Sequence, residues 1–305
     1  MAGLIADKYK EWEKECEERF NRMKANEEEL NRIFIEIYGL QDELTPEVDG
    51  KDITVRRADL QREIKSLLSY AVGCMFGRYS LDVDGLIYAG GEWNTEKYRS
   101  FQPVEDNIIQ IADDDYLDND IISLLCEWLR AAYGEETLEE NLAFIASALG
   151  KKGDTSRSVI RNYFLSDFYK DHCRIYHKRP IYWLFDSGKK NAFKALIYIH
   201  RYHADTIGKL RIDYLHPIQR IYEAEIGRMR SIAGNSENTG ERSLAEKRAE
   251  KLLKQLKECR DYDERLGYLA LLRTELDLDD GVKVNYEKIQ TGLSGERYEV
   301  LARIR

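Results

Sequence analysis

The stretch from residue 170 to residue 201 carries side chains that are suited to bind an anionic partner. Its lysines and arginines alternate with tyrosine, tryptophan and phenylalanine. Basic side chains can neutralise phosphates, basic and amide side chains can hydrogen-bond to base edges, and aromatic rings can hold bases. The predicted DNA-binding residues are Lys170, Arg174, Lys178, Arg179, Ser187, Lys189, Lys190, Asn191, Lys194 and Arg201. The alternative is a surface hairpin with core aromatics and solvated lysines.

The charge of this stretch differs from that of the whole chain, which carries a net charge of -9. Residues 151–232 hold 17 basic and 8 acidic side chains, a charge of +9, whereas residues 82–150 hold 3 and 16, a charge of -13. Each contact of lysine or arginine with phosphate releases counterions, so a local basic surface can bind DNA in an acidic protein. The alternative is that these charges only keep the surface soluble.

Patterns for other ligands are weaker. The sequence Gly188-Lys189-Lys190 resembles part of a phosphate-binding loop, but Trp183 stands where that pattern requires glycine. Four residues offer zinc-binding atoms, but their spacing matches no structural zinc pattern, and the first two fall in a stretch expected to be extended. These residues are Cys173, His177, His200 and His203. Core or partly exposed histidines are the simpler interpretation.

Carboxylate patterns for a divalent cation are also incomplete. Asp167 and Asp171 are four residues apart, which places both on one helix face, but no third carboxylate with a lysine stands near. Residues 277–281 resemble a calcium loop, but the glycine comes one position late and position twelve is Tyr286. No Gly-x-Gly-x-x-Gly, Gly-x-Ser-x-Gly or Pro-Pro occurs. The sequence therefore predicts no catalytic residue, cofactor-binding residue or metal ligand in this chain.

Long helices are predicted on both sides of the basic stretch. Between Tyr9 and Tyr38 apolar residues recur every three, four or seven positions, which is typical of an amphipathic helix that packs on another helix. A second helix is expected to begin at Thr54 or Asp59 and to end near residue 77. Further helices are expected at about 121–133, 156–170, 206–230, where Pro217 kinks or divides the helix, and 244–276.

A change of period near residue 180 predicts a β-hairpin. Two β-prone runs, 180–185 and 192–199, flank a polar tip that contains Gly188. Brief strands or irregular structure are expected within 86–88 and 107–111, a short strand is expected at 282–286, and a loop is expected at 233–240. The predicted fold class is α+β and predominantly α, with long helices flanking a smaller mixed region that contains the hairpin near 180–200.

Two polar segments are expected to begin helices rather than to bind ligands. The acidic run 113–120 precedes a predicted helix, and its charges complement the helix macrodipole. Residues 137–140, Thr-Leu-Glu-Glu, have the pattern of a capping box. Both observations explain polar residues by local backbone needs alone.

Cysteine usage and hydropathy predict the compartment. The five cysteines are odd in number, scattered and mostly at apolar positions, which favours reduced core thiols over a disulfide framework. No stretch approaches the roughly 18 consecutive apolar residues of a membrane span, and the first residues lack the apolar core of a secretory signal. We therefore expect a cytoplasmic protein that makes no membrane contact.

Several segments of the chain resemble one family of enzymes. They are residues 30–40 (LNRIFIEIYGL), 42–48 (DELTPEV), 70–80 (YAVGCMFGRYS), 179–185 (RPIYWLF), 194–202 (KALIYIHRY) and 278–286 (LDDGVKVNY). In this order they resemble the region after the catalytic domain of PglX, the adenine-specific DNA methyltransferase of BREX phage-defence systems. Related fused restriction-modification enzymes share a looser version. The similar segments run from about Leu30 to Tyr286, nearly the whole chain.

The resemblance implies the C-terminal half of such an enzyme, without its catalytic half. It implies a helical spacer at 1–80, a target-recognition region at 81–232 with an acidic part (82–150) and a basic part (151–232), and a helical segment at 233–305. In that family S-adenosylmethionine binds a Gly-rich turn and an Asn-Pro-Pro-Tyr motif clamps the flipped adenine. Because this chain has no Pro-Pro, no catalytic or cofactor residue is carried over, and we expect the chain to be inactive alone.

The partners implied by the resemblance are double-stranded DNA, a methyltransferase catalytic domain in cis or in trans, and other defence-system subunits. The leading hypothesis is a DNA target-recognition and spacer module. The alternative is a helical protein-interaction scaffold, in which the apolar faces of the long helices at 5–38 and 241–276 dock other subunits. The acidic segment, which cannot itself attract DNA, favours this alternative.

Overall fold

The computed structural model describes residues 3–117 and 120–304, and most of these residues are helical. The helices are α1 (Ile5–Tyr38), α2 (Leu60–Met75), α3 (Ile121–Tyr133), α4 (Leu138–Leu149), α5 (Ser156–Ser166), α6 (Phe168–Ile175), α7 (Thr206–Lys209), α8 (His216–Asn235), α9 (Thr239–Leu272) and α10 (Val282–Lys288). The strands are β1 (Ile108–Gln110), β2 (Tyr182–Asp186) and β3 (Lys194–Tyr198). The predicted class, α+β and predominantly α, is confirmed.

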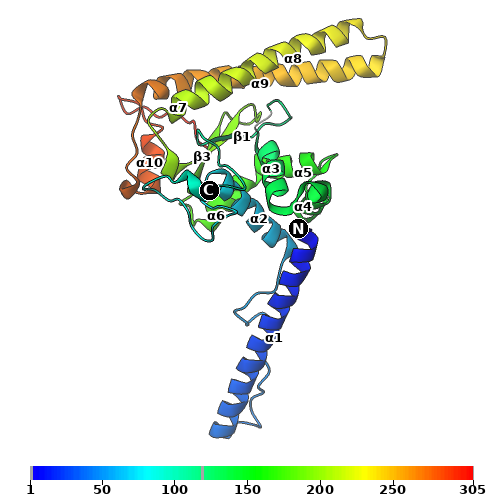
Figure 1. The fold of residues 1–305 in the computed structure, drawn as a ribbon, viewed down its shortest axis with the longest axis vertical. Coiled ribbons are helices and arrows are strands. Elements are labelled where there is room, and N and C mark those ends of the chain that lie inside the picture. The colour runs from blue at the N-terminus through cyan, green and yellow to red at the C-terminus, as the bar shows by residue number, and fades with distance from the viewer. Residues whose placement is uncertain (1–2, 118–119, 305) are drawn as a thin grey trace.

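The molecule has a central body with two helical projections. In Figure 1, α1 leaves one side of the body, and α8 and α9 lie side by side along the other side. Buried residues from all three predicted segments, among them Leu68, Leu125 and Leu252, belong to one hydrophobic cluster. The predicted boundary between residues 232 and 233 lies inside α8, so the C-terminal segment shares this core with the rest of the chain.

A three-stranded antiparallel sheet lies in the body, and the predicted hairpin forms two of its strands. The order is β1-β3-β2, and Ile197 of β3 lies opposite both Ile108 and Trp183. Every residue of β3 is buried. The outer edge of β2 bonds to the end of the chain, where Ala302 N–H donates to the Leu184 carbonyl at 2.8 Å. The hairpin is thus confirmed, and its strands form part of the core.

Helix α1 is confirmed, but its expected packing on another helix occurs only near its start. The Tyr9 ring lies 6.4 Å from the ring of Phe144 in α4, measured between centroids. Farther out, the chain returns along α1 as residues 40–58. There Asn31 donates from Nδ2 to the Pro46 carbonyl at 3.2 Å, and Val48 N–H donates to Glu28 Oε1 at 3.3 Å. A loop rather than a helix therefore lies against the outer half of α1.

The predicted helix at 206–230 is a continuous helical path with a change of geometry before Pro217. Helix α7 passes into a π-helical segment, Leu210–Leu215, and then into α8. Proline has no N–H to donate, so a wider turn just before it lets the chain stay helical. The predicted effect of Pro217 is confirmed. The loop expected at 233–240 is shorter, because α8 continues to Asn235 and Asn238 caps α9 at Gly240 N–H, at 2.9 Å.

One strand prediction is wrong, because residues 282–286 form most of helix α10. Of the two runs expected to be strands or irregular, residues 86–88 are irregular and residues 108–110 form β1. A short β-prone run becomes a strand only where a partner edge is free. The edge of β2 is occupied by residues 300–302 instead, through the Asp186 N–H bond to the Val300 carbonyl at 3.0 Å and the bond from Ala302.

Two helix predictions also need correction. The expected helix at 156–170 is divided at Asp167, whose φ of -126° lies outside the helical region, so that Cys173 lies on α6 and not in an extended stretch. Thr137 does not form a capping box. Its hydroxyl donates to the Tyr133 carbonyl at 3.1 Å, because a 3₁₀ turn leads directly into α4.

The cysteine prediction is confirmed. All five cysteines are buried thiols, and none forms a disulfide among the described residues. Their side chains add to the apolar interior, as at Cys74 and Cys259, where burial raises the pKa of the thiol. The part of the chain that the structure describes contains no helix long and apolar enough to cross a bilayer.

Candidate nucleic-acid interface

Helix α6 presents cations outward because its apolar side chains follow the helical period. Phe168, Tyr169 and Cys173 are buried, whereas Lys170 and Arg174 are exposed on the other side. Lys178 and Arg179 follow in the turn after the helix and are also exposed. These four predicted DNA-binding residues therefore have charged groups that reach solvent.

Asp167 and Asp171 pair with the cations of α6. Asp167 pairs with Lys151 and, at 3.2 Å, with Lys170, and Asp171 pairs with Arg174 at 2.7 Å. Burial acts to raise the pKa of Asp167, but hydrogen bonds from the two lysines outweigh it and hold the pKa below its usual range. Among the described residues, no group of three or more His, Cys, Asp or Glu side chains is placed to hold a metal ion.

The hairpin tip is bound to α9 through one carboxylate. Glu258 Oε1 accepts a hydrogen bond from Ser187 Oγ at 2.8 Å and one from Ala192 N–H at 3.3 Å, and Glu258 Oε2 accepts from Lys190 N–H at 3.0 Å. Ser187 is buried, Asn191 is half-buried with a φ of +51°, and the side chains of Lys189 and Lys190 are exposed. The tip therefore lies on the body, and its two lysine side chains are its exposed residues.

Two further predicted residues serve the fold. Lys194 is buried opposite Asp186 across the hairpin, and its ammonium lies 2.7 Å from that carboxylate. Arg201 donates to the carbonyl oxygens of Val104 and Glu105, both at 2.8 Å, and its guanidinium lies 4.2 Å from the centroid of Trp93. Burial lowers the pKa of Arg201. Both cations therefore bond to groups of the protein itself.

Three neighbouring hollows bring four of the exposed predicted cations together with others that the sequence did not indicate, whereas Arg179 and Lys190 line none of the three. The first and second hollows share Lys65 and Arg174, and the second and third share Lys170. The Lys65 ammonium lies 2.9 Å from the Asp171 carboxylate. The third hollow, between the hairpin and the end of the chain, has a volume of about 790 Å³. Leaving out Lys194, which lines the third hollow but is paired and buried, we call their lysines and arginines the basic track: Arg56, Arg62, Lys65, Lys170, Arg174, Lys178, Lys189, Arg265, Arg297 and Arg303.

Arg265, Arg297 and Arg303 join the track through tertiary structure alone. Arg265 lies on α9, and the other two lie on the segment whose residues 300–302 bond to β2. Arg303 pairs with Glu299 at 3.0 Å, and Arg297 pairs with Glu287. Because these arginines follow the end of α6 by 90 to 128 residues in sequence, no local spacing could have revealed them.

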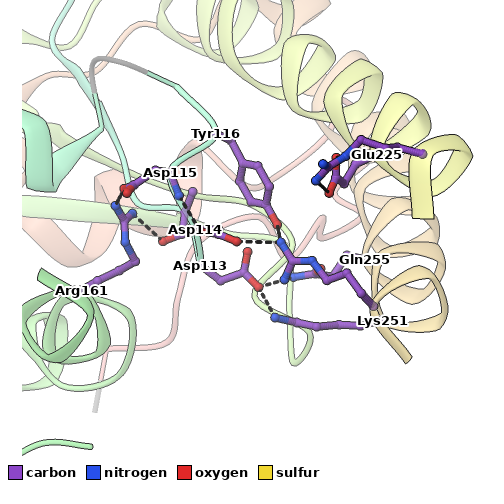
Figure 2. Close-up of polar contacts among 11 residues, drawn as sticks. Asp113, Asp114, Asp115, Tyr116, Arg161, Glu225, Lys251 and Gln255 are labelled. Carbon is purple, nitrogen blue, oxygen red and sulfur yellow. Dashed lines mark hydrogen bonds and ion pairs between the residues drawn. The ribbon is translucent and has the colours of Figure 1, made fainter. Parts of the chain in front are cut away.

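The acidic run at 113–120 does more than begin a helix. The run precedes α3 as predicted, and Asp120 caps this helix by accepting from Ile122 N–H at 2.9 Å. Figure 2 shows how the preceding acids reach in two directions. Asp113 accepts from Gln255 at 2.9 Å and pairs with Lys251 of α9, and Asp115 pairs with Arg161 of α5. The acidic run therefore connects α9 to the body and neutralises the charges of Lys251 and Arg161.

Comparison with known proteins relates this geometry to a family. The chain is 50% identical over 285 residues, 92% of its length, to the adenine-specific methyltransferase PglX of Lacticaseibacillus casei (strain Zhang). It is 36% identical over 316 aligned residues, 94% of its length, to the adenine-specific methyltransferase BrxX of Escherichia coli O9:H4 (strain HS). The chain is homologous to a segment of the PglX and BrxX methyltransferases. The resemblance found in the sequence is thereby confirmed.

The homology covers only part of those enzymes. The alignments take in 24% of the PglX and 26% of the BrxX sequence, so the chain spans about a quarter of the length of the curated relatives it matches. No family model matches the chain. Contact of this PglX-like segment with DNA stays a prediction. Six of the ten predicted residues have exposed side chains: Lys170, Arg174, Lys178, Arg179, Lys189 and Lys190.

Proposed function

We propose that this chain is the DNA target-recognition and spacer part of an adenine-specific DNA methyltransferase in a BREX phage-defence system. In this role the basic track lies along the backbone of double-stranded DNA and places the site for a catalytic part joined in cis or in trans. That part binds S-adenosylmethionine and acts in the cytoplasm. The observation that carries the proposal is the gathering of ten cations, from four distant parts of a PglX-like chain, around three linked hollows.

The charge of the track favours a polyanion over a small ligand. Only five carboxylates line the same hollows, namely Asp59, Asp167, Asp171, Asp186 and Glu299. A phosphate backbone can replace such partners one by one, and each contact releases condensed counterions. Lys194, which is buried, and Arg201, which is half-buried, take no part in this proposal, because their charges are paired or hydrogen-bonded within the protein.

The test is binding of the chain to mixed-sequence duplex DNA, followed by fluorescence anisotropy across roughly 50 to 200 mM salt. The variant Lys170→Gln, Lys178→Gln, Lys189→Gln removes three exposed charges of the track. If all three contact phosphates, the slope of log K against log salt falls by roughly 2 to 3, at about 0.9 per contact. The matched control, Lys10→Gln, Lys14→Gln, Lys247→Gln, removes three exposed charges elsewhere and should bind like the wild type.

A second variant tests the hairpin end of the track separately. Lys189→Glu with Lys190→Glu reverses the charge of the hairpin tip, and unchanged affinity would remove the tip from the interface. Loss of a phosphate contact weakens all sequences alike, whereas loss of a base contact relaxes preference at one position. If the track variant and the control bind DNA equally well, the proposed interface is wrong.

The alternative function, a helical protein-interaction scaffold, is favoured by one observation. The outer half of α1 exposes large apolar side chains, including Phe34 and Ile37. A stable complex with a partner protein, together with no DNA affinity at low salt, would support this alternative. The two functions are compatible within one enzyme, because the track and the outer half of α1 share no residue.

A further inference from the structure

The outer half of α1 has an apolar face that no described part of the chain covers. Leu30 is 54% exposed, Phe34 55% and Ile37 69%, and Ile33 is 43% exposed. Their spacing of three, four and seven residues places them on one side of the helix, and we call these four residues the stripe. Large exposed apolar patches on soluble proteins mark interaction surfaces, whereas scattered apolar residues do not.

The return segment cannot cover this face. Residues 40–58 bond to α1 at Glu28 and Asn31. At 100° per residue these two positions lie on one side of the helix, and Leu30 and Ile37 lie roughly on the opposite side. Figure 1 shows the return segment beside α1 and no other element near the outer end of the helix. The return segment therefore leaves the stripe uncovered, because it bonds to the other side of α1.

The charge around the stripe restricts what can bind it. Residues 27–47 contain seven acidic side chains and one basic side chain, Arg32, a formal charge of -6. A second copy of this chain docked through the same face would bring two such acidic borders together, which is unfavourable. A partner that carries lysine or arginine around an apolar patch satisfies both the stripe and its border.

The length of the relatives indicates where such a patch lies. The chain is homologous to 24% of the PglX sequence, so about three quarters of that enzyme lies outside the homologous segment. We propose that the outer half of α1 docks onto an apolar patch bordered by basic side chains on the remainder of the methyltransferase polypeptide. This inference rests on the homology and on the uncovered face, and it is independent of whether the basic track binds DNA.

The experiment uses the whole enzyme. The protein is a chimera in which this chain replaces the homologous segment of the Lacticaseibacillus casei PglX. Phe34 is replaced by p-benzoylphenylalanine, a photo-crosslinking group. After irradiation, mass spectrometry identifies the linked peptides. We expect a link within one polypeptide to a peptide outside this chain that contains lysine or arginine. The matched control carries the same group in place of Leu271, which is 83% exposed on α9, and should not link to that peptide.

Other results would overturn the proposal. Links only between two copies would identify a second copy as the occupant, and links only within this chain, or none, would mean that the face stays open. If this chimera does not fold, the same substitution in a chimera with the Escherichia coli BrxX repeats the test.

A variant of the isolated chain checks the premise. Phe34→Asp with Ile37→Asp should leave the melting temperature unchanged and the chain monomeric in light scattering, because neither side chain belongs to the core. A large fall in melting temperature would show that the stripe supports the fold of this chain instead. In the chimera, the same pair of substitutions should abolish the crosslink from a group placed at Ile33.

Discussion

Strand β3 of the hairpin and helix α6 belong to the same basic stretch of sequence but use their cations in opposite ways. On β3, Lys194 is buried against Asp186. On α6, Lys170 and Arg174 are exposed. Strand β3 is the central strand of a covered sheet, so a charge on it must be paired, whereas a helix on the surface keeps one side in water. The comparison teaches that a count of basic residues does not give the number of cations available to a ligand.

The same contrast exists within helix α5. The side chain of Arg161 is 6% exposed and pairs with Asp115 and with Asp120, which is buried. Arg157, one turn earlier, pairs with Glu139 at the surface at 2.6 Å. Both arginines contribute equally to the charge of residues 151–232. Only their burial decides whether they hold the fold or face the solvent.

The largest expected effect comes from breaking the buried pair. Arg161→Met should lower the free energy of unfolding by about 3–5 kcal/mol, because it leaves the Asp120 carboxylate buried without its partner. Urea denaturation followed by circular dichroism measures this change. The matched control Arg157→Met should cost no more than about 1 kcal/mol. Equal effects in the two variants would contradict the distinction drawn here.

The next effect concerns the contact that holds the tip. Glu258→Ala removes the acceptor for Ser187 Oγ and for the N–H groups of Lys190 and Ala192. Hydrogen bonds to charged groups contribute about 1.5–3 kcal/mol, so unfolding free energy should fall by roughly that amount and amide exchange at the tip should accelerate. Glu264→Ala, at an exposed position of the same helix, should change neither quantity. Unchanged exchange at residues 187–192 in Glu258→Ala would show that other contacts hold the tip.

A pH effect distinguishes the inner side of α6 from its outer side. Burial, with a smaller contribution from the nearby charge of Arg78, lowers the pKa of His172 to about 3. The folded state therefore favours neutral His172, so this contribution to stability is complete above about pH 6.5 and is lost as the pH falls toward 3. Between pH 6.5 and 5 the loss should be about 2 kcal/mol, at 1.36 kcal/mol per pH unit.

Variants assign this pH effect to one side chain. His172 Nε2 accepts from Ile181 N–H at 3.1 Å and Tyr182 N–H at 3.0 Å, and a glutamine oxygen can accept in its place. His172→Gln should therefore flatten the dependence of unfolding free energy on pH between 6.5 and 5. His203→Gln, at an exposed position, should keep it. A slope that persists in His172→Gln would assign the effect to other groups, of which His200, whose pKa burial also lowers, is one.

The smallest effect on stability is expected on the outer side of α6. Arg174→Met should change the unfolding free energy by less than about 1 kcal/mol, because its pair with Asp171 is exposed at the arginine. The same variant should flatten the salt dependence of DNA binding by about one contact. Arg201→Met should do the reverse, lowering stability while leaving the salt slope unchanged, since Arg201 bonds to backbone carbonyls. An altered slope in Arg201→Met would return that residue to the proposed interface.

Local features of the sequence were enough to predict most elements. The periodicity of α1, the Asp59 cap of α2, the two β-prone runs around Gly188 and the effect of Pro217 all depend on neighbours within a few residues. The failure at 282–286 has a physical cause, because strand formation needs an edge that another part of the chain provides. The break at Asp167 has no proline or glycine to announce it in the sequence.

By itself, the sequence determined the helix and hairpin pattern, the reduced cysteines, the position of the basic stretch and the relation to PglX, because these properties are local or are recorded in residue order. Tertiary structure alone decided which cations remain exposed. Folding buried Lys194 and bonded Arg201 to carbonyl groups, and it brought Arg265 and Arg303 beside α6. The physical reason is that a charge is neutralised or left free by neighbours in space, and those neighbours come from distant parts of the chain.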